Sequence, residues 1–308
     1  MASTPALQIE AAARQPLLAT LRAVVPDFWA LTKPEVNFLI VIATFTGFYL
    51  GCPSNLHPFP FARLFSTLLG TLLVASGTGT LNQYFEHRFD AQMRRTSRRP
   101  VAAGRMRPAT AAWFGIVLSI VGAVYLLVAV NSLASLLAVL TLTSYLFVYT
   151  PLKRITPLCT IAGAFPGAMP PLIGWAAAAG SIVSLKAWLL YTVLFLWQFP
   201  HFMAIAWMYR EDYARAKYLV LPAKGQTGFL AWLTAAPSIL LVIASIATVT
   251  RNTAGAFECS ATAMLGFGLL FYAARLVVLR SRIAARQLLR ATIIYLPLQF
   301  LILVLGKA

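Results

Sequence analysis

The sequence predicts an all-α membrane protein, a polytopic bundle of nine transmembrane helices. Three observations support this fold class: an apolar composition, apolar runs long enough to cross a bilayer as helices, and loops whose positive charge alternates along the chain. Apolar residues make up 60% of the 308 residues and charged residues only 11%, and the mean hydropathy is +0.77. These values lie well outside the composition of soluble domains.

The apolar runs have the length of helices. About twenty mostly apolar residues cross the hydrocarbon core as a helix, and lipid admits only helices and closed barrels, whose strands would alternate over about ten residues. Nine runs of helical length are expected as spans, in chain order at 35–52, 62–82, 110–129, 132–150, 158–179, 186–207, 228–249, 261–279 and 289–306.

Residues 1–30 are expected to form an N-terminal cytoplasmic tail, followed by one nine-helix domain over 31–308. The tail carries no signal-peptide pattern, because charged residues and prolines interrupt it before a sufficient apolar stretch accumulates. From Pro16 to Ala30 it could form a short helix on the membrane surface, with Phe28 and Trp29 at headgroup depth.

The loops between the nine runs alternate in charge. The tail and the even-numbered loops are basic, whereas the odd-numbered loops hold little beyond Arg63, Lys186 and Arg251. The even-loop cations are Arg88, Arg94, Arg95, Arg98, Arg99, Arg105, Arg107, Lys153, Arg154, Arg210, Arg215, Lys217, Lys224, Arg280, Arg282 and Arg286. The positive-inside rule therefore places the N-terminus and the even loops in the cytoplasm.

The net charge of +17 does not indicate a nucleic-acid partner. The cations lie in short turns between spans and form no separable basic domain. Membrane topology and contact with anionic lipid headgroups account for most of them, so the expected surroundings are a lipid bilayer.

The eight acidic residues are more informative, because they are too few to form a solvated surface. Asn82, Glu86 and Asp90 are spaced four residues apart, which places their side chains on one stripe of a helix at the cytoplasmic end of the second run. Carboxylates in a membrane are costly and indicate a function. Oxygen ligands in this arrangement suit Mg²⁺, although pairing of Glu86 and Asp90 with neighbouring arginines would also explain them.

A second acidic pair favours the metal. Glu211 and Asp212 end another apolar run on the same predicted side of the membrane. Two oxygen-rich clusters among arginines and lysines predict a pocket in which Mg²⁺ joins carboxylates to a diphosphate, as ionisation of an allylic prenyl diphosphate requires. Prolines in the fifth run, Pro166, Pro170 and Pro171, fit a helix that bends around a central cavity open to the cytoplasmic side.

Several passages together resemble the UbiA superfamily of intramembrane prenyltransferases, and within it most closely the protohaem IX farnesyltransferases, or haem O synthases. They are LTKPEV at 31–36, NQYFEHRFDAQMRRTSRRP at 82–100, YTPLKR at 149–154, GAFPGAMPPLIGW at 163–175, and WQFPHF followed by REDY at 197–213. Asn82, Glu86 and Asp90 match the first acidic motif of the superfamily. The second motif retains Asp212 but has Ala216 in place of its last acid, which is typical of the haem branch.

The resemblance implies a Mg²⁺-dependent reaction in which farnesyl diphosphate ionises, its C1 alkylates a vinyl group of haem B, and diphosphate is released. It also implies the cell inner membrane as location, and haem A synthase or terminal oxidase assembly factors as possible partners. By position, Asn82, Glu86, Asp90 and Asp212 are expected to bind the metal and the diphosphate. The expected diphosphate clamps are Arg95, Arg99, Lys153 and Arg154, whereas Lys217 fits a phosphate contact and an ordinary interfacial anchor equally.

Haem contacts are harder to assign, because the chain has only three histidines. His201 lies inside an apolar run, where an ionisable side chain indicates a function, so it is the first candidate for an axial ligand or a group beside the vinyl. A hydrogen-bonded structural histidine would explain its place as well. His87, at the membrane edge, is the candidate for holding a propionate.

Two other functions compete with this prediction. A membrane transporter would also carry intramembrane polar residues, and the two acidic clusters sit in similar places about 125 residues apart, as internal repeats would place them. A transporter should hold its polar site near the midplane, however, and these carboxylates lie at one face. The second competitor is an aromatic quinone-precursor prenyltransferase of the same superfamily, against which Ala216 and the WQFPHF passage argue.

Overall fold

A computed structural model describes residues 24–53, 58–221, 227–252 and 255–307, and within them every regular element is helical. Residues 16–23 of the proposed surface helix lie outside the described residues, and residues 24–31 are helical. The elements are α2 (Pro34–Gly51), α3 (Phe61–Asp90), α4 (Pro108–Ala129), α5 (Ser132–Ser144), the π-helix η1 (Tyr145–Tyr149), α6 (Thr150–Leu152), α7 (Cys159–Gly167), α8 (Met169–Ala179), α9 (Leu185–Met208), α10 (Arg210–Arg215), α11 (Thr227–Asn252), α12 (Ala256–Leu279) and α13 (Arg282–Leu305).

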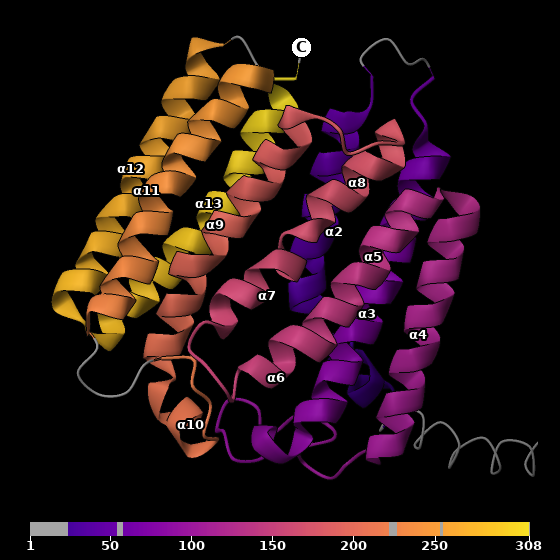
Figure 1. Cartoon of the computed structure of the whole chain (residues 1–308), viewed down its shortest axis with the longest axis vertical. Helices are drawn as coiled ribbons and strands as arrows, with labels where there is room; N and C mark the ends of the chain where they lie inside the picture. Colours follow the sequence, from indigo (N-terminus) through magenta and orange to yellow (C-terminus); the bar gives the residue numbers. More distant parts are fainter. Residues whose placement is uncertain (1–23, 54–57, 222–226, 253–254, 308) are drawn as a thin grey trace, which may run out of the picture.

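The all-α membrane fold is confirmed. In the described part of the chain, eight helices are long and apolar enough to cross a membrane, the fourth of them comprising α5, η1 and α6. Each corresponds to one of the expected runs. The remaining run, 158–179, contains two shorter helices, α7 and α8, which meet at Ala168. The helices stand side by side with α7 and α8 among them (Figure 1).

The break between α7 and α8 has a local cause, and side chains of α9 make contacts near it. Proline lacks an amide N–H and its ring clashes with the carbonyl four residues earlier, so Pro170 and Pro171 cannot continue α7. Near the break, the Ala164 and Phe165 carbonyls both accept from the Ala168 amide. Helix α9 adds a second donor to each: the Gln198 amide lies 3.0 Å from the Ala164 carbonyl, and the Tyr191 hydroxyl lies 3.4 Å from that of Phe165.

Two helix ends differ from the sequence prediction. The apolar part of the second run was expected to end at residue 82, and α3 continues to Asp90, as the helical stripe of Asn82, Glu86 and Asp90 requires. The eighth loop was expected to contain Arg282 and Arg286, but both lie in α13, which begins at Arg282. Ser281 caps that helix by accepting a hydrogen bond from the Ala284 amide at 3.1 Å, and arginine is a good helix former. Apolar length alone therefore underestimates helices whose ends are charged.

Small residues let the helices of the first half approach closely. A Cβ at Gly77 of α3 would overlap the Gly115 carbonyl and Ser119 of α4, and a Cβ at Gly47 of α2 would overlap the Pro171 carbonyl of α8. Glycine is the residue that permits such contacts between membrane helices. Close backbone contacts therefore join α3 to α4 and α2 to α8.

The even-numbered loops gather at one end of the bundle, with α10 beside the loop that follows α3 (Figure 1). Hydrogen bonds join three of these segments: the Arg95 amide donates to Asp212 at 3.2 Å and the Leu219 amide to the Lys153 carbonyl at 2.7 Å. We call this the charged end. At the opposite end, Lys307 donates to the carbonyls of Tyr49 and Cys52, each at 2.6 Å, which ties the last helix to α2.

Candidate active site

The last turns of α3 carry the first acidic motif as the sequence predicts. Asn82, Glu86 and Asp90 are 2%, 5% and 1% exposed, so all three side chains point into protein and not into lipid or water. The Asn82 amide donates to Oε2 of Glu86 at 2.9 Å, which confirms that residues four apart share one stripe. Buried carboxylates require compensating partners.

Cations from three separate segments supply those partners. The Lys153 ammonium lies 3.0 Å from Oε1 and 3.1 Å from Oε2 of Glu86. The Arg99 guanidinium donates to Oδ2 of Asp90 at 2.7 Å. Lys33, directly before α2, donates to Oδ1 of Asn82 at 2.8 Å. Each residue of the first motif is therefore matched with one cation.

The second acidic cluster adjoins the first. Asp212 on α10 is 7% exposed and accepts hydrogen bonds from the Arg95 amide and from the Arg215 guanidinium. Its neighbour Glu211 is exposed. Residues 216–221 follow α10, and we call them the strap. From the strap, the Tyr218 hydroxyl donates to Oε1 of Glu86 at 2.9 Å, so the strap and α3 meet at one carboxylate.

Aromatic rings surround the cations. The Lys153 ammonium lies 4.5 Å from the centre of the Tyr149 ring, and the Arg154 guanidinium lies 4.4 Å from that of Phe89. Cations over ring faces are stabilised by the ring quadrupole, more strongly where water is excluded. The site thus combines positive charge with apolar walls, a combination suited to a substrate with a charged head and a hydrocarbon tail.

The electrostatics of the charged end follow from this packing. Burial, followed by repulsion from Arg99 and Lys153, lowers the pKa of Lys33 to about 7. Burial is the largest single effect on Lys153 and would lower its pKa, but the Glu86 carboxylate and the neighbouring tyrosines together outweigh burial and hold the pKa well above its usual range. Burial, followed by the Glu86 carboxylate, raises the pKa of Tyr218, so this phenol remains a hydrogen-bond donor at neutral pH. Lys153 therefore stays charged at neutral pH, whereas Lys33 gains or loses its proton near pH 7.

The chemistry of the donor set fits a magnesium ion. Among the described residues no three His, Cys, Asp or Glu side chains are gathered closely enough to hold a metal by themselves. Mg²⁺ does not require this, because it usually takes one or two carboxylates and completes its shell with waters and substrate phosphates. Asp90 accepts its ion pair through Oδ2, and no described residue donates to its Oδ1. Asn82, Glu86, Asp90 and Asp212 remain the predicted ligands.

Not every predicted site residue joins this cluster. Lys217 is exposed and has a positive φ of 55°, and the strap turns at this residue. The exposed side chain of Arg95 lies over the ring of Tyr209 at 5.4 Å, and only its backbone reaches Asp212. These three clamps, Arg95, Arg154 and Lys217, therefore face the rim of the site, whereas Arg99 and Lys153 lie within it.

The two histidines predicted for haem have protein partners. His201 Nδ1 lies 2.9 Å from the Thr292 hydroxyl of α13, and its ring stacks on Trp197 at 4.5 Å. His87 Nδ1 lies 2.6 Å from the Tyr84 carbonyl. The contacts of His201 are those that the structural interpretation expects, and one ring nitrogen of each histidine stays without a partner among the described residues. Their haem roles remain predictions.

Sequence reasoning missed Lys33 and Tyr218. Lys33 lies in the passage LTKPEV, and its position between an apolar tail and Pro34 offered a weak signal of its own. Tyr218 offered none, because a tyrosine near a membrane surface is ordinarily part of the aromatic belt. Both reach the site only through folding, from 49 and 132 residues away from Asn82 and Glu86 respectively.

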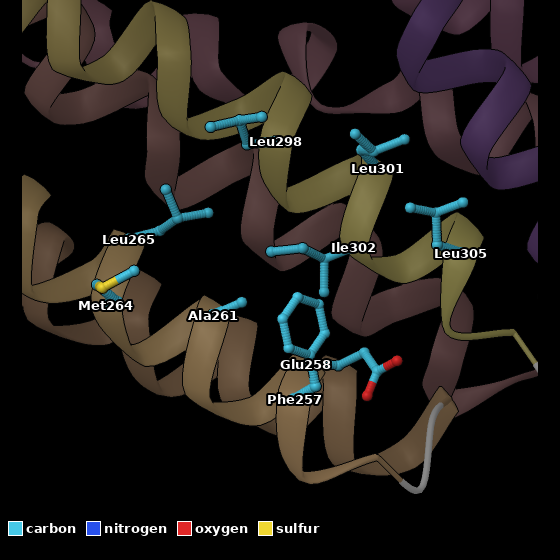
Figure 2. Close-up of a pocket in the computed structure, with 9 residues that line it drawn as sticks. All are labelled: Phe257, Glu258, Ala261, Met264, Leu265, Leu298, Leu301, Ile302 and Leu305. Atoms are coloured by element: carbon cyan, nitrogen blue, oxygen red, sulfur yellow. The ribbon is translucent and has the colours of Figure 1, made fainter.

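An apolar groove elsewhere is not part of this site. It lies between α12 and α13, has a volume of about 300 Å³, and is lined by side chains such as Phe257, Met264 and Leu305 (Figure 2). Glu258 is the one ionisable residue of its lining. Because α12 begins and α13 ends away from the charged end (Figure 1), the groove is remote from the carboxylates.

Comparison with known proteins places the chain in a family. The model of the UbiA prenyltransferase family matches residues 40–301. A protoheme IX farnesyltransferase of Solibacter usitatus is 41% identical over 288 residues, covering 91% of this chain and 98% of that protein. One from Salinibacter ruber is also 41% identical, covering 88% and 95%.

Solved structures share the fold at lower identity. A UbiA homologue from Aeropyrum pernix superposes with a TM-score of 0.65 at 20% identity, covering 85% of this chain and 95% of that one. A UbiA homologue from Archaeoglobus fulgidus, solved with GPP and Mg²⁺, gives 0.61 at 15% identity, covering 87% and 99%. With its helical fold, its buried carboxylates and these matches over most of its length, the chain belongs to the UbiA prenyltransferase family.

Proposed function

We propose that this protein is a protohaem IX farnesyltransferase. It transfers the farnesyl group of farnesyl diphosphate to a vinyl group of protohaem IX, or haem B, and releases diphosphate. The observation that carries the proposal is the buried Glu86 carboxylate, held by Lys153, Asn82 and Tyr218 beside the Asp90–Arg99 ion pair. The names of relatives that share 34% to 43% identity with this chain support the choice of substrates.

In the proposed reaction the bond between C1 of the farnesyl group and its diphosphate oxygen breaks, and the electron pair leaves with the diphosphate. C1 then forms a bond to the terminal vinyl carbon of protohaem IX, and water adds to the other vinyl carbon with loss of a proton. Lys153, Arg99 and Lys33 lie where they can neutralise the departing diphosphate. Arg95, Arg154 and Lys217 at the rim attract and orient it.

A magnesium ion, when bound, would offset the negative charge that develops on the leaving group. Asn82, Glu86, Asp90 and Asp212 are the residues that would hold it, through the oxygen donors it prefers. The aromatic side chains shield the farnesyl carbocation from water. Tyr145 and Tyr149, whose rings lie next to Lys153, contribute to this shielding. His201 and His87 are the proposed haem contacts.

The proposed setting is the cell inner membrane, with the N-terminus and the charged end in the cytoplasm. This orientation follows from the cations that gather at one end of the bundle. There the site would open to soluble farnesyl diphosphate. The product would then pass to haem A synthase or to factors that assemble a terminal oxidase.

The test is incubation of the purified protein with haem B, farnesyl diphosphate and Mg²⁺, followed by separation of the haems and mass measurement. We expect a haem heavier by one farnesyl group and one hydroxyl group. Glu86→Gln is the matched control, because it keeps the size of the side chain and removes its charge, and it should lower the rate at least 100-fold. Unchanged haem B together with prenylation of an aromatic quinone precursor would overturn the proposal and favour the quinone branch of the family.

A further inference from the structure

We propose that Tyr218 is a positioning residue of this site: its hydroxyl fixes the Glu86 carboxylate in the orientation that receives a divalent metal, and its strap fixes Lys153 beside it. The inference rests on the proposed function only in taking Glu86 as a metal ligand. It assigns a role to a side chain that lies outside both acidic motifs.

The first evidence is the hydrogen-bonding pattern of Glu86. A carboxylate offers about four acceptor positions. Lys153 contacts both oxygens, Asn82 donates to Oε2, and Tyr218 donates to Oε1 at 2.9 Å. Asn82 and Tyr218 therefore hold opposite oxygens and together determine the rotation of the carboxylate plane. Without the phenol, Oε1 would keep only the Lys153 ammonium as a donor among the described residues.

The second evidence is that the Tyr218 ring is itself fixed. The residue is 6% exposed and packs with Met93 and Ala216, and its ring centre lies 5.7 Å from that of Phe89 and 6.2 Å from that of Tyr213. A surface tyrosine would be free to turn. This one can present its hydroxyl only toward Glu86.

The third evidence is the backbone on both sides of Tyr218. Lys217 adopts a left-handed conformation with φ of 55°, which is costly for a residue with a Cβ. The Tyr218 amide then donates to the Tyr213 carbonyl at 2.9 Å, and the Leu219 amide donates to the Lys153 carbonyl at 2.7 Å. The strap thus holds the phenol and the backbone of Lys153 in one unit, so Glu86 and its cation keep a fixed separation.

Hydrogen bonds of this kind orient a ligand before the metal arrives. Partners that orient metal-binding side chains typically contribute 10- to 100-fold in metal affinity or activity when removed. A phenol donating to a carboxylate is charge-assisted and stronger than a neutral hydrogen bond. Loss of the Tyr218 hydroxyl should therefore weaken metal binding about tenfold while the ring continues to fill its place.

The experiment compares Tyr218→Phe with Tyr213→Phe in the full-length protein in lipid nanodiscs. Tyr213 belongs to the same aromatic cluster, and within the described residues its hydroxyl has no hydrogen-bond partner. Binding of Mn²⁺ in the presence of inorganic diphosphate is measured by electron paramagnetic resonance. Tyr218→Phe should raise the dissociation constant for Mn²⁺ about tenfold, and Tyr213→Phe should leave it within about twofold of wild type. Turnover at saturating Mg²⁺ should change less than the half-saturating Mg²⁺ concentration.

A double-mutant cycle separates positioning from mere packing. In the Glu86→Gln background, Tyr218→Phe should weaken Mn²⁺ binding by less than about twofold, because the hydroxyl acts through the charged carboxylate. A full tenfold effect in that background, or unchanged Mn²⁺ binding by Tyr218→Phe alone, would overturn the inference. So would a wild-type protein that binds no Mn²⁺. None of these outcomes depends on the prenyl acceptor, so a failed haem assay leaves the role of Tyr218 standing.

Discussion

Breaking the ion pair between Lys153 and Glu86 should destabilise the folded protein. Removing one partner of a buried pair leaves the other charge uncompensated, which costs about 3 kcal/mol or more. Lys153→Met should therefore lower the thermal midpoint of the purified protein and abolish product formation. The double variant Lys153→Met with Glu86→Gln should recover part of the midpoint and none of the activity. A double variant no more stable than Lys153→Met would contradict the pairing.

Lys33 should give the protein a distinctive pH dependence. Its pKa is lowered by burial to about 7 from an ordinary value of 10.5, so the folded state binds the proton less tightly than the unfolded state. Stability therefore rises with pH from about 7 toward 10, because over this window the unfolded chain is still protonated at this residue. Below pH 7 the cost of burying the charge is fully present.

Comparison with Lys33→Met isolates that contribution, since the two proteins share every other titrating group. Thermal midpoints are measured from pH 7 to 9.5. The midpoint of the wild type should rise relative to that of the variant as the pH increases. A constant difference between the two midpoints across this range would mean that Lys33 stays charged in the fold.

At the scale of single residues, the sequence could identify a site residue when it belonged to a motif. Asn82, Glu86 and Asp90 are recognisable because scarce polar groups recur at helical spacing, and the structure confirms their common stripe. Lys33 and Tyr218 were not recognisable as site residues in this way, because each is an ordinary residue for a membrane surface. Tyr218 reaches Glu86 only because the folded strap lies against the end of α3.

At the scale of helices, the most extensive contact in the first half of the bundle is between α3 and α4. Gly77→Leu should destabilise the fold by about 1 to 3 kcal/mol, because its side chain would overlap Ser119 and the Gly115 carbonyl. Gly268→Leu on α12 is the matched control, since no atom lies within 4 Å of the position its Cβ would occupy. Thermal unfolding in detergent measures both. Equal midpoints for the two variants would contradict the packing described for α3 and α4.

Apolar length predicted where helices are and underestimated how far they extend. The run 62–82 ends where polar residues begin, yet α3 continues for eight further residues because its polar side chains are satisfied by cations from other segments. The prolines of the run 158–179 predicted a bend near Ala168. The sequence could not reveal that Gln198 and Tyr191 of α9 would donate to the Ala164 and Phe165 carbonyls near that break, because those partners are remote in the chain.

For the whole molecule, the distribution of cations predicts orientation in the membrane. After replacement of Cys52, Cys159 and Cys259, a cysteine at Ala103 beside the charged end should react with a membrane-impermeant maleimide only in inside-out vesicles. A cysteine at Val183, which is 93% exposed at the opposite end, should react only in right-side-out vesicles. Labelling with the opposite pattern would reverse the proposed orientation. Labelling of both positions in one vesicle type would contradict the bundle topology.

The support that α9 gives to the interrupted helix also limits how the protein can move. Sliding α7 along α9 would separate the Gln198 amide and the Tyr191 hydroxyl from the α7 carbonyls, and a polar group left without a partner in a medium without water costs several kcal/mol. These contacts restrict movement of α7 relative to α9 in the middle of the bundle. Entry of a bulky planar molecule and exit of its alkylated form are therefore expected to involve displacement of the strap and its neighbouring turns and not sliding of α7 along α9.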